Sequence, residues 1–363
     1  MTRATIGGPK IELDTPALCL DIEAVEANIE RMAAAFRDGP TRLRPHAKTH
    51  KSPILAHMQI AAGAAGITCA KLGEAEVMAA AGIRDILIAN QIVGAGKIAR
   101  LVNLAAHTDV MACVDDAGNA RDLDAAARAK GVRLRVLLEL NIGMGRCGAL
   151  PFAPALEMAR LICGLPGLRF EGLMGYEGHT VFLTDLDERR RETEASLAQL
   201  VGTAELLREN GIAVPIVSSG GTGTYFITGQ YPGVTEIEVG SYITMDAQYR
   251  EEVGIDFAYA LTVLATVTSV HGEHAIIDAG LKTVTRDFGL PLVFDPPGWE
   301  LTGLSEEHGH LERRGGAALA VGDKVELVPN HGCTTINLHD EYHVVRRGVV
   351  EAVWPIAARG KVR

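Results

Sequence analysis

The segment RPHAKTHKSP, residues 44–53, places two lysines and two histidines at the end of an apolar stretch. A lysine amine can bind an aldehyde covalently or take up a proton, so Lys48 is a candidate catalytic group. A plain surface lysine would show the same local pattern. Whether Lys48 belongs to a site therefore depends on what the other segments carry.

Three further segments could hold an anionic or oxygen-rich ligand. SSGGTGTY (218–225) follows an apolar run, and its glycines and hydroxyl residues can form a concavity of donors suited to a phosphate. GSYITMD (240–246) offers a second turn of this kind. NIGMGRCG (141–148) contributes Arg146, whose guanidinium could face a ligand oxygen, although an exposed arginine in an ordinary loop is the alternative.

Together these segments indicate pyridoxal 5′-phosphate as a cofactor. This molecule needs a lysine for its aldehyde, donors for its phosphate and partners for its ring. No single segment is specific for it. Their joint occurrence at successive predicted strand ends is what favours the assignment.

A candidate metal site lies in PNHGCTTINLHDEYHVV, residues 329–345. His331 and Cys333 are two positions apart, so an extended chain would place both side chains on one face, about 6–7 Å apart. Imidazole and thiolate can bind a divalent metal, with water or substrate completing the shell. A buried histidine beside a buried thiol is the alternative. His339 and Asp340 are weaker candidates.

The elements that must position these groups are short apolar runs alternating with helical segments. This pattern predicts an α/β fold with a parallel sheet covered on both faces, and its eight or so units favour a (β/α)8 barrel, although a doubly wound sheet has the same periodicity. In a barrel, Lys48 would stand at the C-terminal edge of a strand, where barrel enzymes carry their chemistry. The expected strands are 17–20, 42–47, 66–70, 85–90, 110–115, 134–141, 170–176, 216–221 and 236–242, with helices at 23–36 and 120–131.

After about residue 250 the sequence becomes rich in β-branched residues and poor in helical segments, which predicts a C-terminal β domain. We expect the barrel at 12–250, and the β domain with the metal motif at 251–363 together with residues 1–11. The Gly- and Pro-rich segment 285–320 is expected to form loops of that domain.

Composition limits the classes of function. The chain has 363 residues, 47% of them hydrophobic and 22% charged, which allows a sizeable core. Its formal charge of −10 argues against nucleic-acid binding and against an anionic membrane surface. No apolar run approaches the roughly 20 residues that span a bilayer. Six cysteines without pairing cues and a polar N-terminus favour a cytoplasmic protein.

The motifs, taken in order, resemble a known enzyme family. They are LDTPALCLDIEAVEANI, RPHAKTHKS, MGRCG, SSGGTGTY, GSYITMD, DAGLK, EEHG and PNHGC. Together they resemble the D-threonine aldolase / D-serine dehydratase family, metal-dependent relatives of the alanine-racemase-like, fold-type III pyridoxal-phosphate enzymes. The resemblance runs from about residue 12 to the C-terminus and implies an alanine-racemase-type barrel.

The resemblance also implies a role for each matching residue. Lys48 would carry the cofactor aldehyde and, once freed by substrate, face the α-carbon. Arg146 would lie near the phenolic oxygen of the cofactor and Tyr176 close to its ring. His331 and Cys333 would bind Mn²⁺ or Zn²⁺ at the β-hydroxyl of the substrate. The remaining cofactor-binding residues would be Ser219, Gly221, Thr222, Gly240, Ser241 and Tyr242. The enzyme would be a homodimer.

Two reactions fit this family. An aldolase breaks the Cα–Cβ bond of a D-3-hydroxy-amino acid to give glycine and an aldehyde, whereas a dehydratase expels hydroxide and ends with a 2-oxo acid and ammonia. The His–x–Cys pair resembles the dehydratases, but the tail INLHDEYHVVRRGVVEAVWPIAARGK resembles D-threonine and 3-hydroxy-D-aspartate aldolases. His179 in GYEGH could act as the base of an aldolase, or be structural. We favour the aldolase, with D-serine or D-threo-3-hydroxyaspartate dehydratase as the alternative.

Two other classes remain open. A pyridoxal-phosphate homeostasis protein uses a similar barrel but has no catalytic β domain, so the C-terminal hundred residues argue against it. A racemase needs a second base opposite Lys48, usually a tyrosine of the β domain. Tyr342 is present, but it lies beside a metal motif that a racemase does not need.

Overall fold

The computed structural model describes residues 6–363, which form two compact units. The barrel unit contains residues 32–48, 52–240 and 360–363. The β unit contains residues 6–31, 49–51 and 241–359. The chain therefore crosses between the units several times, once within helix α1 (Ile22–Phe36) and once between Lys48 and Thr49.

The barrel unit contains one sheet of eight parallel strands in the order β2-β9-β8-β7-β6-β5-β4-β3. Beyond β2, the chain pairs with the other end of the sheet, because Ala47 N donates to Thr68 O (2.8 Å) and Thr68 N donates to Pro45 O (2.9 Å). The predicted barrel of parallel strands is thus confirmed. Its strands are β2 (Arg42–Leu43), β3 (Ile67–Cys69), β4 (Asp85–Gln91), β5 (Asp109–Val114), β6 (Leu134–Leu140), β7 (Leu168–Gly175), β8 (Ile216–Ser219) and β9 (Glu236–Ile237).

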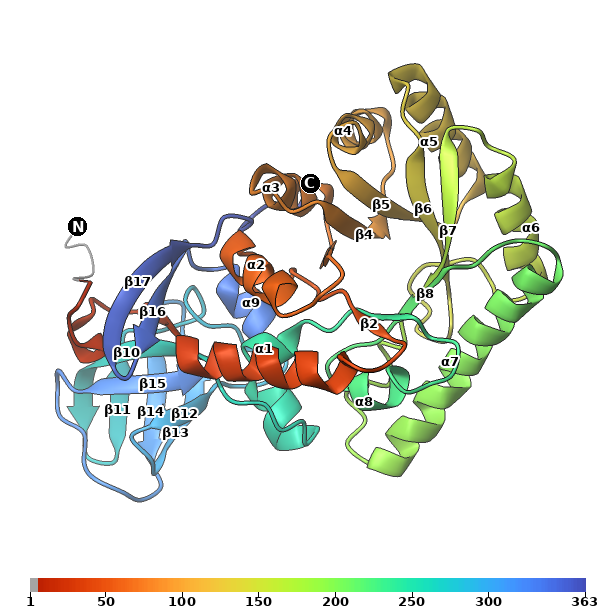
Figure 1. The fold of residues 1–363 in the computed structure, drawn as a ribbon. Coiled ribbons are helices and arrows are strands. Elements are labelled where there is room, and N and C mark those ends of the chain that lie inside the picture. Colours follow the sequence, from red (N-terminus) through yellow and green to blue (C-terminus); the bar gives the residue numbers. More distant parts are fainter. Residues whose placement is uncertain (1–5) are drawn as a thin grey trace. The chain divides into compact units, whose positions relative to one another are not determined.

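Helices cover the outside of this sheet, and in Figure 1 α4 to α7 lie along the outer side of β4 to β8. Strands covered in this way can be apolar on both faces, and Leu87, Met111 and Leu137 are completely buried. Helix α5 begins where Asp116 accepts a hydrogen bond from Asn119 N and ends at Gly131, whose φ of +73° suits glycine. The helices are α2 (Pro53–Ala61), α3 (Leu72–Ala80), α4 (Ala95–Ala105), α5 (Ala117–Lys130), α6 (Ala153–Cys163), α7 (Leu186–Glu209) and α8 (Tyr225–Thr228).

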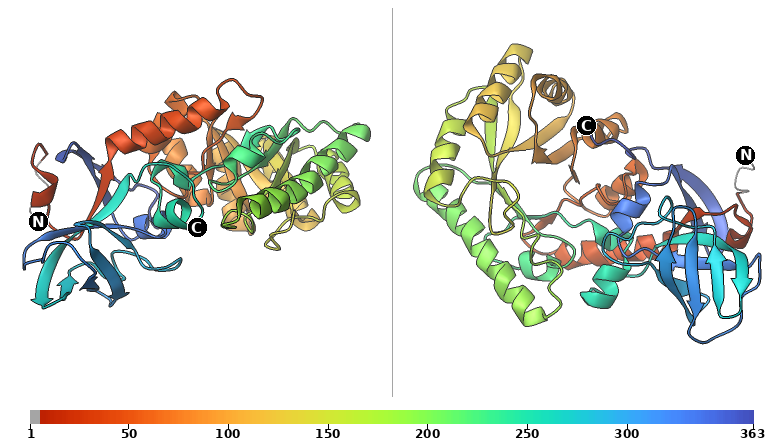
Figure 2. Two further views of the ribbon diagram at one scale, coloured as in Figure 1. Left: turned by 90° about the horizontal axis from the view of Figure 1, so that it is seen from below. Right: turned by 180° about the vertical axis from the view of Figure 1, so that it is seen from behind.

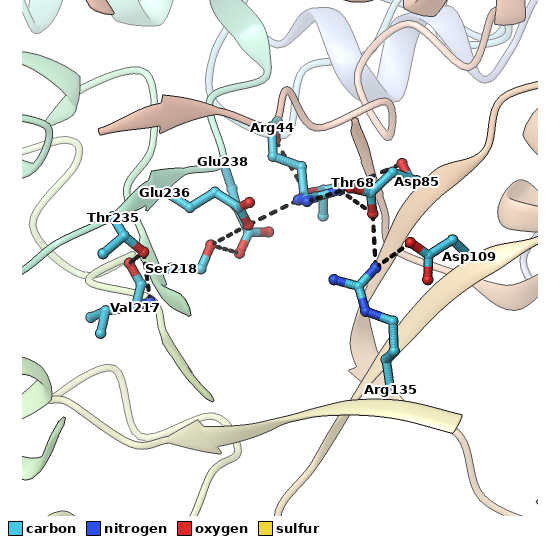
Figure 3. A network of polar contacts seen from close by, with 10 residues as sticks. All are labelled: Arg44, Thr68, Asp85, Asp109, Arg135, Val217, Ser218, Thr235, Glu236 and Glu238. Carbon is cyan, nitrogen blue, oxygen red and sulfur yellow. Dashed lines mark hydrogen bonds and ion pairs between the residues drawn. The ribbon is translucent and has the colours of Figure 1, made fainter. Parts of the chain in front are cut away.

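A network of ion pairs joins the N-terminal ends of several barrel strands (Figure 3). The buried Arg44 pairs with Glu236 at 2.9 Å and with Asp85 at 3.0 Å. Asp85 also pairs with Arg135 (3.2 Å), which in turn pairs with Asp109 (2.9 Å). In parallel barrels this end serves stability, whereas the opposite end serves chemistry.

The β unit is built on a nine-stranded sheet, and Figure 2 shows its strands from two further sides. The main order is β13-β14-β11-β10-β1-β16-β17, and β15 pairs with both β10 and β12. Its strands are β1 (Ala17–Asp21), β10 (Leu261–His271), β11 (His274–Ile277), β12 (Leu292–Asp295), β13 (Trp299–Leu304), β14 (Gly309–Arg313), β15 (Lys324–Val328), β16 (Glu341–Arg346) and β17 (Val349–Pro355). Short helical segments are η1 (Lys10–Glu12), η2 (Ser241–Ile243), η3 (Gln248–Glu252) and α9 (Gly332–Ile336).

Two expectations about this unit differ from the structure. Strand β1 was expected in the barrel, but it pairs antiparallel with β10 and parallel with β16, so residues 12–31 lie in the β unit, as do residues 241–250. The segment 285–320 was expected to form loops, but it contains β12, β13 and β14. In β13 the buried Trp299 and Leu301 alternate with the exposed Glu300 and Thr302, a short period-two pattern that the glycines, prolines and charges around it in the segment 285–320 concealed.

Within residues 6–363, no helix combines the length and the apolar character needed to cross a membrane.

Candidate active site

Three residues predicted from separate segments converge on the ring of Tyr176. Lys48 follows β2 and is half-buried, with Nζ 5.8 Å from the centroid of the Tyr176 ring. Arg146 follows β6, and its guanidinium carbon lies 5.7 Å from the same centroid. Tyr176 itself comes directly after β7. The C-terminal ends of three strands thus bring a lysine, an arginine and an aromatic ring together.

The glycine turn 218–225 approaches the same ring from the end of β8. A β-carbon at Gly221 would lie 3.2 Å from the Tyr176 hydroxyl, so the backbone passes close to this side chain. A β-carbon at Gly223 would lie 2.0 Å from the Val181 carbonyl oxygen, and Gly220 has a φ of +92°. Close packing therefore requires these glycines whether or not a ligand binds, and the turn still leaves main-chain groups near Tyr176.

The hydroxyl residues of this turn have a partner that the sequence did not suggest. Ser219 Oγ donates a hydrogen bond of 2.6 Å to Glu177, and Thr224 Oγ1 donates one of 2.7 Å to the same carboxylate. Glu177 is completely buried. Thr222, the remaining predicted hydroxyl ligand, is also buried within the turn.

Two more carboxyl groups at strand ends were missed from the sequence. Glu139 is buried, lies 3.8 Å from Arg146 and accepts hydrogen bonds from Gln91 Nε2 (2.5 Å) and Cys147 Sγ (3.0 Å). A small hollow is lined by residues 139–142, 144, 146 and 147 together with Tyr176. Glu238, half-buried just after β9, accepts from Ser218 Oγ at 2.8 Å (Figure 3), and burial raises its pKa to about 7. The only signal was an acidic residue in an apolar strand, alone in the case of Glu139 and together with Glu236 in the case of Glu238.

His179, the predicted base, is exposed beside the loop that carries Arg146. A β-carbon at Gly143 of that loop would lie 2.8 Å from His179 Cε1. The other neighbour is Ser196 on α7, with Oγ 3.5 Å from His179 Nε2. This position leaves the imidazole accessible to solvent.

The predicted metal ligands lie in the β unit, in a local structure that differs from the expectation. The segment was expected to be extended, but His331 precedes α9 and Cys333 lies in its first turn, because the chain turns into a short helix after β15. His331 Nδ1 lies 2.5 Å from Asp287 Oδ2, and the imidazole stacks on Phe288 at 4.1 Å with an interplanar angle of 9°. Cys333 Sγ lies 3.2 Å from Thr49 Oγ1.

The surroundings of this pair are strongly charged. Burial opposes the protonated form of His331, but Cys333 and Asp287 together raise its pKa to about 9. Asp246, missed from the sequence, is buried and accepts from Gly332 N at 3.3 Å, and burial raises its pKa to about 6. Across the described residues, no three His, Cys, Asp or Glu side chains form a ready-made metal cluster. The chain thus offers an imidazole–thiol pair.

The turn 240–246 is divided between the units. Gly240 is the last residue of this stretch in the barrel unit, whereas Ser241 and Tyr242 belong to the β unit and form η2. Ser241 Oγ lies 3.9 Å from Cys333 Sγ. The buried ring of Tyr242 packs edge-on against Phe257, with centroids 5.7 Å apart, as a core residue does.

Comparison with known proteins identifies the family. The family described as "Alanine racemase, N-terminal domain" matches residues 20–248, and the one described as "Putative serine dehydratase domain" matches residues 260–345. A D-threonine aldolase of Arthrobacter sp. is 41% identical over 359 residues, which cover 98% of this chain and 95% of that protein. The chain belongs to the D-threonine aldolase / D-serine dehydratase family. The resemblance stated from the motifs is thereby confirmed.

Other members of the D-threonine aldolase / D-serine dehydratase family support the same placement. A 3-hydroxy-D-aspartate aldolase of Paracoccus denitrificans (strain Pd 1222) is 38% identical, covering 98% of this chain and 94% of its own. The crystal structure of D-threonine aldolase from Filomicrobium marinum matches with a TM-score of 0.96 and 40% identity, covering 99% and 100% of the two chains. The D-threo-3-hydroxyaspartate dehydratase from Delftia sp. HT23 matches at 0.88 and 32% identity, covering 96% and 98%. These relatives are lyases.

Proposed function

We propose that the chain is a pyridoxal-phosphate- and divalent-metal-dependent lyase that cleaves D-3-hydroxy-amino acids to glycine and an aldehyde. The observation that carries the proposal is the meeting of Lys48, Arg146 and the glycine turn around Tyr176. The high identity to a D-threonine aldolase and to a 3-hydroxy-D-aspartate aldolase supports the choice of reaction.

The groups around Tyr176 fit the proposed cofactor. Lys48 would hold its aldehyde, Tyr176 would lie against its ring, and Arg146 would contact its phenolic oxygen. The turn 218–225 is a cradle in which a side chain at Gly221 would meet Tyr176, so it suits a ligand that needs close main-chain approach. When bound, the cofactor would supply the electron sink for the pair released at Cα.

The pair His331 and Cys333 suits a soft or borderline divalent ion, with Mn²⁺ and Zn²⁺ as the candidates. Asp287 holds Nδ1 of the imidazole, which leaves Nε2 as the coordinating atom. The ion would lower the pKa of the substrate β-hydroxyl. Because the chain provides two ligands, water and the substrate hydroxyl would complete the shell.

The proposed cleavage needs a base and a proton donor. The β-hydroxyl proton would pass to His179, whose exposed imidazole can exchange protons with solvent. The Cα–Cβ bond then breaks, the Cβ oxygen becomes a carbonyl, and Cα takes up a proton to give glycine. Lys48 is the candidate donor of that proton. Its amine and the Arg146 guanidinium both lie beside the Tyr176 ring, where the cofactor would bind.

A dehydratase is the second candidate. The His–x–Cys pair favours it, because this spacing resembles the metal motif of the dehydratases, and the Delftia dehydratase shares the fold over almost the whole chain. The same groups would then assist loss of hydroxide from Cβ, with Lys48 removing the α-proton. The aldolase is preferred because the more similar relatives are aldolases.

One incubation separates the two reactions. With D-threonine, an aldolase yields glycine and acetaldehyde, whereas a dehydratase yields 2-oxobutanoate and ammonia. We expect the first pair, with L-threonine inert and with activity lost in Lys48→Ala. Formation of 2-oxobutanoate would replace the aldolase by the dehydratase, and absence of both product pairs with D-threonine and D-3-hydroxyaspartate would overturn the proposed lyase.

We also propose a homodimer located in the cytoplasm, as the family resemblance implies. Analytical ultracentrifugation of the full chain tests the first point, and fractionation of the source cells tests the second.

A further inference from the structure

Glu177 is a completely buried carboxylate whose partners all come from one short segment. Oε2 accepts from Ser219 Oγ (2.6 Å) and from Gly220 N (3.1 Å). Oε1 accepts from Thr224 Oγ1 (2.7 Å) and from Thr228 Oγ1 (2.6 Å). Both oxygens therefore have two donors each, and all four donors lie within residues 219–228.

Burying a carboxylate costs free energy, and the positions of its four donors are fixed by the fold. A buried carboxylate is tolerated only when donors replace its lost hydration, and three short hydrogen bonds from hydroxyls and one of 3.1 Å from a main-chain N–H do so here. They connect the end of β8, the glycine turn and helix α8 to one carboxylate. The carboxylate thus fixes the path of the turn through groups on both sides of Gly221 and Thr222.

The hydrogen bonds also decide which groups remain for a ligand. A hydroxyl has one proton to donate. Because the Ser219 and Thr224 hydroxyls donate theirs to Glu177, they cannot also donate to a phosphate. Ser219, expected from the sequence to bind the cofactor, is therefore a bridge between the turn and Glu177. Within the turn 218–225, donors for a phosphate would therefore come from its middle, whose path Glu177 holds.

Glu177 is itself anchored next to the site. Its carbonyl oxygen accepts from Thr180 N and from Thr180 Oγ1, both at 2.9 Å. Its neighbour in the chain is Tyr176, the ring that meets Lys48 and Arg146. One strand end therefore supplies both the aromatic ring and the anchor of the turn.

We propose that Glu177 is a positioning residue that forms the phosphate cradle before the cofactor arrives. This inference rests on the proposed function, in which the turn 218–225 takes the cofactor phosphate. A negative charge cannot attract a phosphate, so the benefit of Glu177 is preorganisation. Because the turn is already ordered in the cofactor-free chain, the binding free energy of the cofactor is not reduced by the entropy lost in ordering it. Its effect should therefore depend on the phosphate and not on the aldehyde.

The test measures the phosphate advantage, defined as the Kd of pyridoxal divided by the Kd of pyridoxal 5′-phosphate, for the full chain stripped of cofactor. Both ligands share the aldehyde that Lys48 would bind, so their ratio isolates the phosphate. Glu177→Ala should shrink the advantage about tenfold, because the turn loses its common acceptor. Glu177→Gln should shrink it about threefold, because the amide keeps one acceptor and the threonine hydroxyls can rotate to accept from its NH₂.

A matched control is available in the same unit. Asp124 is also a buried carboxylate that accepts from a main-chain donor, Gly167 N at 2.7 Å, and it pairs with Arg128. None of its described partners belongs to the turn. Asp124→Asn should leave the phosphate advantage unchanged, even if it lowers stability. Hydrogen exchange of the amides of residues 219–224 in the cofactor-free chain should accelerate in both Glu177 variants and not in this control.

The outcomes are distinct. If the phosphate advantage is unchanged in Glu177→Gln and Glu177→Ala, even where both Kd values rise in proportion, Glu177 is only structural and the inference is overturned. If Glu177→Ala does not fold, Glu177→Gln alone decides. If the wild-type chain binds pyridoxal as tightly as its phosphate, the proposed role of the turn itself fails. If the wild type shows the advantage and only the Glu177 variants lose it, both proposals are supported.

Discussion

Replacing Arg44 by methionine should strongly destabilise the barrel unit. Its side chain is 3% exposed and that of its partner Glu236 is 6% exposed, so the pair is shielded from water. Methionine retains much of the side-chain volume and removes the charge. The carboxylate of Glu236 would then lie buried without its cation. Arg44 also pairs with Asp85 (Figure 3).

The expected magnitude follows from this burial. Breaking a buried ion pair by removing one partner costs about 3–5 kcal/mol. Asp85 adds little to the loss, because it retains Arg135 at 3.2 Å and is partly exposed. Removing the second charge as well should recover part of the loss, so the double variant Arg44→Met, Glu236→Gln should be about 1–3 kcal/mol more stable than Arg44→Met.

Urea unfolding followed by circular dichroism measures these differences. The matched control is Arg314→Met in the β unit, because the Arg314–Glu300 pair is 53% and 56% exposed. An exposed pair contributes about 0–1 kcal/mol, so this control should be close to wild type. If Arg44→Met costs no more than the control, or if the two losses in the double variant simply add, then Arg44 and Glu236 are not a shielded, coupled pair and the argument from burial is refuted.

The other predictions concern the β unit. Tyr342→Phe should cost about 0.5–1.5 kcal/mol in urea unfolding, because the substitution removes the buried hydrogen bond of 2.7 Å that the Tyr342 hydroxyl donates to His50 O; a loss below 0.5 kcal/mol, the usual limit for a surface change, would contradict this. Asp287→Asn should weaken Zn²⁺ binding about 10- to 100-fold in a chelator competition, because Asp287 orients His331; an unchanged affinity would show that the orientation is set elsewhere. Burial raises the pKa of Asp246 from 3.8 to about 6, so the metal-free chain should lose about 2 kcal/mol of folding free energy relative to Asp246→Asn as pH rises from 3.8 to 6, and about 3 kcal/mol over the whole titration at about 1.4 kcal/mol per pKa unit; parallel pH profiles would refute it. EDTA should abolish turnover of D-threonine while visible absorbance of the bound cofactor remains, and Mn²⁺ or Zn²⁺ should restore turnover; full activity in EDTA would remove the metal from the mechanism.

Much of the barrel and of its candidate site could be predicted from the sequence, because the signals are local. A lysine, an arginine and a glycine turn each follow an apolar run, and parallel strands bring such ends to one edge of a barrel. The residues that hold these groups gave no local signal. Glu177 is one carboxylate in a short loop, and its donors lie more than forty positions away. Asp287 reaches His331 across 44 positions.

The strand predictions failed where a strand pairs with segments that are far away in the sequence. The run 17–20 has the composition of a barrel strand, and only its pairing with β10 and β16 assigns it to the β unit. The helical turn at Cys333 replaces an expected strand for a related reason: the tight geometry after β15 is set by tertiary contacts such as the one from Gly332 N to Asp246. Apolar pattern specifies that a segment is buried, but not its partner.

The position of β1 has a consequence for synthesis on the ribosome. This strand precedes all eight barrel strands in the chain, yet the two strands that flank it, at 261–271 and 341–346, follow all of them. All eight barrel strands are complete by residue 237. The nascent barrel can therefore close while both edges of β1 are still unpaired. Such a strand is open to intermolecular pairing until residues 261–346, which contain both of its partner strands, have emerged.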